Sequence, residues 1–478
     1  VKAGFTDEKS KKATEKNDSS ADSKAEEKSS KEKDSARGIV TRAKSSFVQR
    51  IVQASNIGNW LTAADQQTVF IFLNASRTFL WSGTRSDHEG DQQLLSRMDL
   101  SYNTPTCHDV NPLTRTTSKL ELVLGFETGD LLCYDALQCK YERMNKAREN
   151  DWPITKVKWI PGSETRFVAA TKDGYLMTLD RAKGTWNFPK ISSDPTQHGG
   201  CTSNRTSIPD FFQCLTEPNR QSNPINLFHI SNEAITDVSF SPDCQHVALV
   251  GEDGYLRIFD YVQNKLRDVF QSYFGGFTCV CWSGDGRYIL TGGKDDLVSV
   301  WSFHDRTLVA RCQGHKSWVR GVAFDNFMYA NEGEYRFGSV GEDNMLLFWD
   351  FSMRSLIRPQ NLVSNTFFNN SNESTLSTKG VKLSVYSPNL TSSTNICNTT
   401  NNVGTGNESD KNNSNNNDSN TTSLETIIHP LASRDEVSTL FPVVSVAAHG
   451  APICNIQFSK SWVATACKHG IIKIWKRP

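Results

Sequence analysis

Apolar residues recur along this chain in short runs that share one internal spacing. Each such run ends on an apolar residue and carries two more, five and two positions before that end. The five runs with this spacing end at Trp159, Phe240, Trp282, Phe324 and Phe458. Short runs rich in β-branched and aromatic residues, bounded by Gly, Asp and Asn, are typical of β-strands joined by tight turns. The pattern therefore predicts a β-protein built from copies of one unit.

A second spacing links each of these runs to a later run in the same unit. An Asp stands six residues before the last apolar or aromatic residue of the unit's third run. The four pairs are Asp173 with Leu179, Asp253 with Phe259, Asp295 with Trp301, and Asp343 with Trp349. Both spacings are typical of the WD repeat, whose unit is one four-stranded blade of a β-propeller. The sequence therefore predicts an all-β WD-repeat propeller.

Counting the units gives seven blades. Five show the first-strand spacing, and two degenerate units precede them at residues 47–81 and 120–135. Six or eight blades would fit the same runs if the N-terminal part were divided differently. The chain ends on a third strand at residues 471–475. We expect an N-terminal strand near Phe47 or Thr68 to complete that last blade, because closing the ring removes an exposed edge.

Composition separates the repeats from two segments with no strand pattern. Residues 1–37 are almost wholly charged residues, Ser and Ala, and residues 353–441 are rich in Asn, Ser and Thr. Such segments bury too little apolar surface to offset their ordering entropy, so both are predicted to be disordered. The rest is assigned to blades 1–6 at residues 38–352, and to the end of blade 6 with the final blade at residues 442–478.

Three insertions interrupt the repeats, at residues 182–222, 326–334 and 353–441. The first-to-second and third-to-fourth connections of a blade emerge on one face, so all three insertions are expected there. We call the opposite side the clear face. Phe274 and Trp318 lie in connections on the clear face of neighbouring blades. Large aromatics are enriched at interface hot spots, so we predict that both bind a partner. The alternative is that each ring packs on its own blade.

Charge and cysteine usage limit the partners and the chemistry. Lys plus Arg equals Asp plus Glu at 52 each, so no basic field favours nucleic acid. No run of 18 apolar residues predicts a membrane span, and the printed chain begins without an apolar signal segment. The twelve cysteines include no CxxC pair, which favours free core thiols in a reducing compartment over metal or disulfide sites. We therefore expect a cytoplasmic or nuclear protein without a metal or other cofactor.

Four residues of one unit resemble a catalytic Ser–His–Asp group: His315, Ser339, Asp343 and Trp349. In WD blades, residues at these positions form a buried hydrogen-bonded network, because each polar group would be costly if unpaired. An altered second copy stands in the last unit, at His449, Thr465, His469 and Trp475. Repetition of the positions argues against a unique active site. We predict a structural network and no catalytic residue.

Several strings go beyond the generic repeat: residues 105–109 (PTCHD), 157–164 (VKWIPGSE), 272–276 (SYFGG), 314–319 (GHKSWV) and 335–341 (YRFGSVG). They resemble the WD repeat-containing protein 20 family, which includes dystrophia myotonica WD repeat-containing protein and fungal creC. The resemblance implies a non-catalytic subunit that binds and activates a ubiquitin-specific protease of the ubiquitin carboxyl-terminal hydrolase 12 or 46 type. A second WD-repeat activator acts alongside it in that family. The resemblance also implies that the protease is bound by aromatic residues in the strings that contain Phe274 and Trp318.

Two other classes of function stay open. A substrate receptor of a cullin ubiquitin ligase, or a general protein-interaction scaffold, would use the same fold. Such receptors often carry Trp-Asp-x-Arg at a blade's end, and here Trp349-Asp350-Phe351-Ser352 lacks the Arg. An enzyme is disfavoured because no unrepeated polar constellation occurs. The resemblance therefore favours an activator that binds its protease away from the active cysteine and shifts it toward a competent conformation.

Overall fold

The computed structural model describes residues 39–41, 45–62, 68–85, 92–116, 118–144, 152–184, 186–187, 213–214, 221–327, 333–354, 356 and 426–477. The chain separates into two units, and the structure describes only one of them. One comprises Val1–Pro359 with Glu425–Pro478 and contains every described strand. The other, Gln360–Leu424, lies outside the described residues, as do residues 1–37. The predictions of disorder for the tail and for most of the long insertion therefore fall outside the described part.

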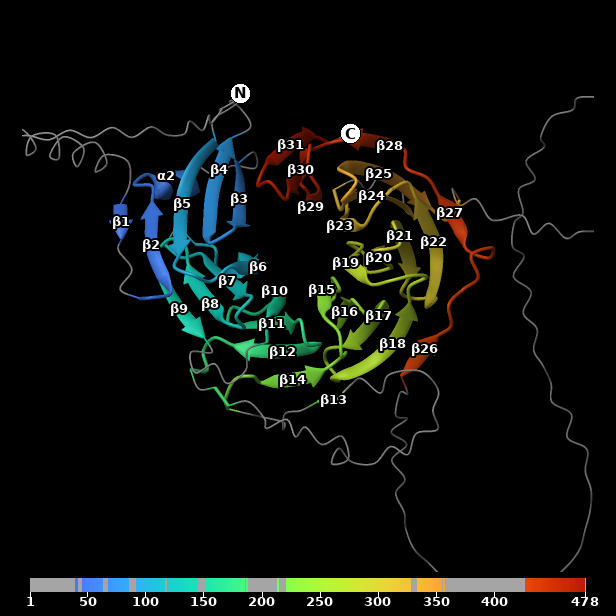
Figure 1. Cartoon of the computed structure of the whole chain (residues 1–478), viewed down its shortest axis with the longest axis horizontal. Coiled ribbons are helices and arrows are strands. Elements are labelled where there is room, and N and C mark those ends of the chain that lie inside the picture. Colours follow the sequence, from blue (N-terminus) through green and yellow to red (C-terminus); the bar gives the residue numbers. More distant parts are fainter. Residues whose placement is uncertain are drawn as a thin grey trace, which may run out of the picture. The chain divides into compact units, whose positions relative to one another are not determined.

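The described strands form seven sheets, the blades of a seven-bladed β-propeller (Figure 1). The all-β class and the blade count are as predicted. Blade 2 has the basic antiparallel order: β6 (Pro105–Val110), β7 (Glu121–Phe126), β8 (Leu131–Asp135) and β9 (Lys140–Met144). Blade 3 adds an outer fifth strand: β10 (Ile154–Trp159), β11 (Arg166–Thr171), β12 (Tyr175–Asp180), β14 (Asn226–His229) and β13 (Gln213–Cys214).

Blades 4–6 repeat the antiparallel order of blade 2 from first strand to fourth. Blade 4 is β15 (Ile235–Phe240), β16 (His246–Gly251), β17 (Tyr255–Asp260) and β18 (Lys265–Gln271). Blade 5 is β19 (Phe277–Trp282), β20 (Tyr288–Gly293), β21 (Leu297–Ser302) and β22 (Thr307–Gln313). Blade 6 is β23 (Val319–Phe324), β24 (Glu334–Gly341), β25 (Met345–Ser352) and β28 (Val444–Ala447). Among the described residues blade 7 has three strands, β29 (Ile453–Phe458), β30 (Trp462–Cys467) and β31 (Ile472–Lys476).

The apolar core lies between neighbouring blades. Between blades 4 and 5, for example, Val250 and Ile258 pack with Trp282 and Trp301, and all four side chains are buried. Full burial of a large apolar side chain contributes about 1.5–3 kcal/mol. The regularly spaced apolar side chains of the first strands are therefore the ones that pack against the adjacent sheet.

One residue in each first strand makes a separate link between blades. In blades 2–7 the pairing of the first and second strands skips one residue, which is a β-bulge. In blades 2–5 that residue is a threonine whose hydroxyl donates to a backbone carbonyl in the next blade's first strand: Thr106, Thr155, Thr236 and Thr278. Arg320 and Cys454 stand at this position in blades 6 and 7, so the row of links ends at blade 6.

No strand in the described part of the chain is shared by blade 1 and blade 7, which differs from the prediction. Blade 1 has the order β1 (Ile39–Thr41), β2 (Val48–Gln53), β5 (Gln92–Leu100), β4 (Thr78–Arg85), β3 (Thr68–Ala75). The prediction that a strand near Phe47 or Thr68 completes the last blade is therefore wrong. The reason is packing: Val48 and Ile51 of β2 are buried beside Met98 of β5. Within the described residues, β31 pairs on one side only, and Ile474 is 45% exposed.

The last part of the predicted insertion also differs from expectation. β26 (Ile427–His429) pairs in parallel with β18, and β27 (Ser438–Leu440) pairs in parallel with β22. We call residues 426–440 the strap, because they run along the outer edges of blades 4 and 5 before β28 completes blade 6 (Figure 1). The strap also contacts Tyr273, next to Phe274. The clear face is therefore not free of the insertion at this point.

Candidate functional site

Phe274 and Trp318 lie in equivalent connections of neighbouring blades. Phe274 lies between β18 and β19, and Trp318 lies between β22 and β23. Their side chains are 72% and 38% exposed, so neither ring is enclosed by its own blade. Both connections lead from a fourth strand into the next first strand, which is the clear face. The structure leaves both rings accessible; that they bind a partner stays a prediction.

Lys294, which the sequence analysis did not single out, connects the two aromatic positions. Its backbone N–H donates to the Gly276 carbonyl, in the connection that carries Phe274, at 2.9 Å. Its ammonium group lies 4.7 Å from the centre of the Trp318 ring. The Arg320 guanidinium lies 5.3 Å from the same ring. Each cation–π contact at such an exposed site contributes about 0.5–1 kcal/mol. Trp318 is thus held by two cations at the surface.

Two acidic residues flank these cations. Glu252 forms an ion pair with Lys294. Glu342 accepts hydrogen bonds from Lys468 at 3.0 Å and from the Nε of Arg320 at 2.8 Å. These bonds, that from Lys468 first, lower the pKa of Glu342. Exposed pairs of this kind contribute little to stability, so their main effect is on the orientation of the side chains around Trp318.

Four of these charged residues, but not Arg320, belong to a larger set with one position in each of blades 2–7 and, among the described residues, none in blade 1. Its members are Glu127, Lys172, Glu252, Lys294, Glu342 and Lys468. Each donates its backbone N–H to the carbonyl of the residue just before its own blade's first strand. The sign of the charge alternates from blade 2 to blade 7. The set could have been found from the sequence, because each member directly precedes the turn position that Asp occupies in blades 3–6. Neutral in sum, it does not favour long-range attraction of a charged partner.

The four residues that resembled a catalytic group come together inside blade 6. Nδ1 of His315 lies 2.9 Å from Oδ2 of Asp343, and Nε2 of His315 lies 2.7 Å from the hydroxyl of Ser339. The indole N–H of Trp349 donates to the same hydroxyl at 2.8 Å. Ser339 and Trp349 are fully buried. Burial acts to raise the pKa of Asp343, but hydrogen bonds from His315 and the Lys316 amide outweigh it and lower that pKa. The hydroxyl is enclosed and lies out of reach of a substrate.

The altered copy in blade 7 is shorter by one member. His449 and the Trp475 indole both reach the Thr465 hydroxyl at 2.8 Å. Nδ1 of His449 is buried and has no hydrogen-bond partner among the described residues. His469 occupies the position of the turn Asp, so the carboxylate that orients His315 in blade 6 has no counterpart here.

A cavity lies at the other end of the first strands, away from the clear face. Its volume is about 420 Å³, and it is lined at the ends of β6, β10 and β15 by residues that include Val110, Trp159 and Phe240. Two of the strings beyond the generic repeat, residues 105–109 and 157–164, reach this cavity. The Asp109 carboxylate accepts from the Trp159 amide at 2.8 Å.

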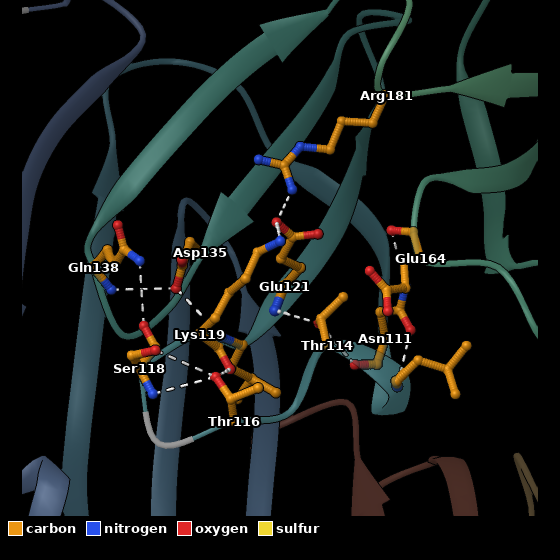
Figure 2. Close-up of polar contacts among 12 residues, drawn as sticks. Asn111, Thr114, Thr116, Ser118, Lys119, Glu121, Asp135, Gln138, Glu164 and Arg181 are labelled. Atoms are coloured by element: carbon orange, nitrogen blue, oxygen red, sulfur yellow. Dashed lines mark hydrogen bonds and ion pairs between the residues drawn. The ribbon is translucent and has the colours of Figure 1, made fainter.

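Polar contacts brace one wall of this cavity. The Asn111 side chain donates to the carbonyls of Ser163 and Glu164, on the neighbouring blade, at 3.1 and 3.3 Å. Figure 2 shows these contacts and the buried Glu121, which forms ion pairs with Lys119 and Arg181. The loop of blade 2 that lines the cavity is therefore held against blade 3.

The described residues offer no place for a metal ion, and two core cysteines carry unreactive thiols. No group of three His, Cys, Asp or Glu side chains in the described part is arranged to hold a metal. Burial raises the pKa of Cys107 to about 11 and that of Cys279 to about 12, so both thiols are protonated at neutral pH. No described helix is long and apolar enough to cross a membrane.

Four-stranded blades whose turn Asp and buried Trp share a hydrogen-bonded network define the WD-repeat β-propellers. In agreement, the family model "WD domain, G-beta repeat" matches residues 223–260 and 264–302. The UBP9-binding protein bun62 of Schizosaccharomyces pombe is 32% identical over 438 residues, which cover 91% of this chain and 75% of that protein. A chain in a crystal structure of the mitotic checkpoint complex aligns over 98% of this chain and 99% of that chain, at 12% identity and a TM-score of 0.48. The chain belongs to the WD-repeat family that contains this UBP9-binding protein.

Proposed function

We propose that this chain is a non-catalytic regulatory subunit that binds and activates a ubiquitin-specific protease through its clear face. The observation that carries the proposal is the pair of exposed rings, Phe274 and Trp318, in neighbouring connections; Lys294 contacts the Trp318 ring and bonds to Gly276, two residues from Phe274. The name of the relative bun62 records binding to UBP9, a ubiquitin-specific protease.

The physical reason for expecting a partner at this site is that both rings are exposed to solvent. A phenylalanine that is 72% exposed gains about 1.5–3 kcal/mol when a partner removes it from water. The cations beside Trp318 hold its ring at the surface instead of in its own blade. Two large anchors within one connected surface are the usual composition of an interface hot spot.

The finer assignment follows the resemblance to the WD repeat-containing protein 20 family. The protease is then of the ubiquitin carboxyl-terminal hydrolase 12 or 46 type, and a second WD-repeat activator binds the same protease. This chain then binds the protease away from the active cysteine. The free energy that couples the binding surface to the active site is typically about 1–3 kcal/mol. The complex works in the cytoplasm or the nucleus.

The second candidate is a substrate receptor of a cullin ubiquitin ligase. Asp350, at the end of blade 6, pairs with Arg336 at 2.6 Å, and Phe351 is buried. Ser352 stands where such receptors carry Arg, so this blade end lacks the exposed cation of that motif. Affinity purification separates the candidates, because the protease co-elutes in one case and a cullin adaptor in the other.

The decisive test uses Phe274→Ala and Trp318→Ala in the full chain. Truncation of a central aromatic anchor costs about 2–4 kcal/mol of binding, a roughly thirty- to thousandfold loss of affinity. Each variant is titrated into the protease, and its thermal unfolding is measured alone. Val262→Ala is the matched control, because Val262 is 70% exposed but lies in a third-to-fourth connection on the other face. We expect weaker binding with unchanged unfolding for the two variants and no effect for the control. Unchanged affinity with a lowered melting temperature would place both rings in the packing of their own blades.

A further inference from the structure

Tyr273 occupies in blade 5 the position that His315 occupies in blade 6. Each stands four residues before the first residue of the next first strand, Phe277 in one case and Val319 in the other. His315 turns inward and bonds to its own blade. The Tyr273 hydroxyl instead donates to the Ala432 carbonyl of the strap, at 2.9 Å. The side chain that would complete the network of blade 5 is therefore used to hold the strap.

Two arginines complete this contact. The Arg434 guanidinium, from the strap, lies 5.2 Å from the centre of the Tyr273 ring. The Arg311 guanidinium, from β22, lies 5.5 Å from the same ring and donates to the Arg434 carbonyl at 2.7 Å. Three separate interactions thus join the strap, blade 5 and the residue next to Phe274.

The strap is itself fixed on both sides of this point. Before it, His429 stacks on Phe270 with 4.4 Å between ring centres, and its Nε2 lies 2.8 Å from the buried Asp268 carboxylate. After it, β27 pairs with β22. Tyr273 therefore contacts a segment that is held at both ends, which is the arrangement needed to fix the connection to which Phe274 belongs.

The rest of that connection is a tight turn. The Ser272 hydroxyl donates to the Gly275 carbonyl at 2.6 Å, and Gly275 has a φ of +64°. A left-handed residue of this kind suits glycine. Phe274 lies between the Tyr273 anchor and this glycine, and its own ring is exposed. Its direction is thus set by the turn on one side and by the strap on the other.

We propose that the strap is a positioning element of the partner site, with Tyr273 and Arg434 as positioning residues that fix how Phe274 is presented. The inference rests on the proposed function for the identity of the partner. The long insertion ends in the strap, and the strap's contact with Tyr273 links the insertion to the clear face. A structural change or a modification that loosens the strap would lower the affinity for the protease without touching the interface.

The test uses the full chain with Arg434→Ala or Tyr273→Phe. Thr426→Val is the matched control, because it removes a strap hydrogen bond, to the Leu266 carbonyl, far from Tyr273. Hydrogen exchange of the backbone amides at residues 272–277 is measured in the chain alone, with β23 as internal reference. Affinity for the ubiquitin-specific protease and thermal unfolding are measured on the same samples. For Arg434→Ala we expect exchange and dissociation constant each to rise about three- to tenfold, with unchanged unfolding. Tyr273→Phe should show the smaller effect, and Thr426→Val none.

Each outcome decides the inference. Unchanged exchange in both variants would show that the strap does not hold this connection, and the inference falls. Faster exchange with wild-type affinity would show that the strap braces blade 5 without serving the partner, which also overturns it. If the wild-type chain fails to bind the protease, the proposed function fails, and the exchange data still show whether the strap holds the Phe274 connection.

Discussion

Blades 5 and 6 are neighbours with the same strand pattern, yet the Asp at their turns has different surroundings. In blade 6, Asp343 accepts from His315 at 2.9 Å and from the Lys316 and Met345 amides at 2.9 and 3.2 Å. In blade 5, Asp295 accepts from the Leu297 amide at 3.2 Å, and the described residues give it no imidazole partner. Tyr273, at the position of the imidazole, has turned to the strap.

The difference appears in the acidity of the two carboxyls. Burial raises the pKa of Asp295 to about 6. The pKa of Asp343 is lowered instead, because its hydrogen bonds outweigh its burial. The bond between Trp and hydroxyl is the same in both blades: Trp301 donates to Thr291 at 2.9 Å, as Trp349 does to Ser339 at 2.8 Å. The blade therefore needs this bond, and the partner of its Asp can be exchanged for an outward contact.

The largest expected effect is that of Asp343→Ala. The change leaves the buried His315 and two backbone amides without their acceptor, which costs about 1–3 kcal/mol of unfolding free energy. His315→Ala should cost a similar amount, and a double-mutant cycle in denaturant should show strong coupling between the two. Asp295→Ala removes less and should cost less. Equal losses of unfolding free energy for Asp343→Ala and Asp295→Ala would contradict the difference between the two blades. Lost protease binding at unchanged stability would assign the network to the partner site.

The second prediction concerns pH. Because the folded pKa of Asp295 is raised to about 6 from 3.8, the native chain binds more protons than the unfolded chain between these values. The contribution of Asp295 to stability therefore falls as pH rises from about 4 to 6. Asp295→Asn, which keeps an acceptor for the Leu297 amide, should remove this slope and be more stable than wild type above that window.

Asp343→Asn is the matched control for this measurement. Its carboxyl has a lowered folded pKa, so its contribution is present at neutral pH and is lost as pH falls. The variant should therefore be less stable than wild type at pH 7. Denaturant midpoints across the acid range decide the matter. A wild-type slope in Asp295→Asn would show that another group titrates there.

A smaller effect is expected for Tyr273→His, which gives blade 5 the imidazole that blade 6 has. The new side chain can bond to Asp295 while the strap loses the Tyr273 hydroxyl, so gain and loss offset each other to within about 1 kcal/mol. The pH dependence assigned to Asp295 should disappear, and protease binding should weaken. Persistence of that pH dependence would show that the position of the imidazole is not what separates the two blades.

The smallest effect is expected for replacement of residues 360–424 by a Gly/Ser linker of about a quarter of that length. Two halvings of a loop change its closure free energy by about 1 kcal/mol, in the favourable direction. The melting temperature should stay nearly constant as long as the strap is kept. Replacement of residues 426–440 as well should lower both stability and protease affinity. If replacing residues 360–424 alone weakens binding, residues of the insertion outside the strap also contribute to the partner site.

The sequence by itself determined the repeating unit. The apolar residues of the first strands and the turn Asp recur at fixed spacings, because every blade must face its neighbours in the same way. Those spacings predicted the all-β propeller and its seven blades. They also placed Phe274 and Trp318 in exposed connections, and brought His315 together with Ser339 and Asp343. These are local properties, since each follows from the phase of one strand or one turn.

Only the tertiary structure decided which strands lie at the edges of the blades. Sheet edges present the same row of backbone donors and acceptors, so nothing in the sequence marks the edge that a given strand will join. β2 joined β5 instead of β31, and the strap joined β18 and β22 in parallel. The contact of Tyr273 with Ala432 depends on that choice, because the two residues are distant in the chain. The contacts of Lys294 with Gly276 and with the Trp318 ring likewise needed blades 5 and 6 to lie side by side.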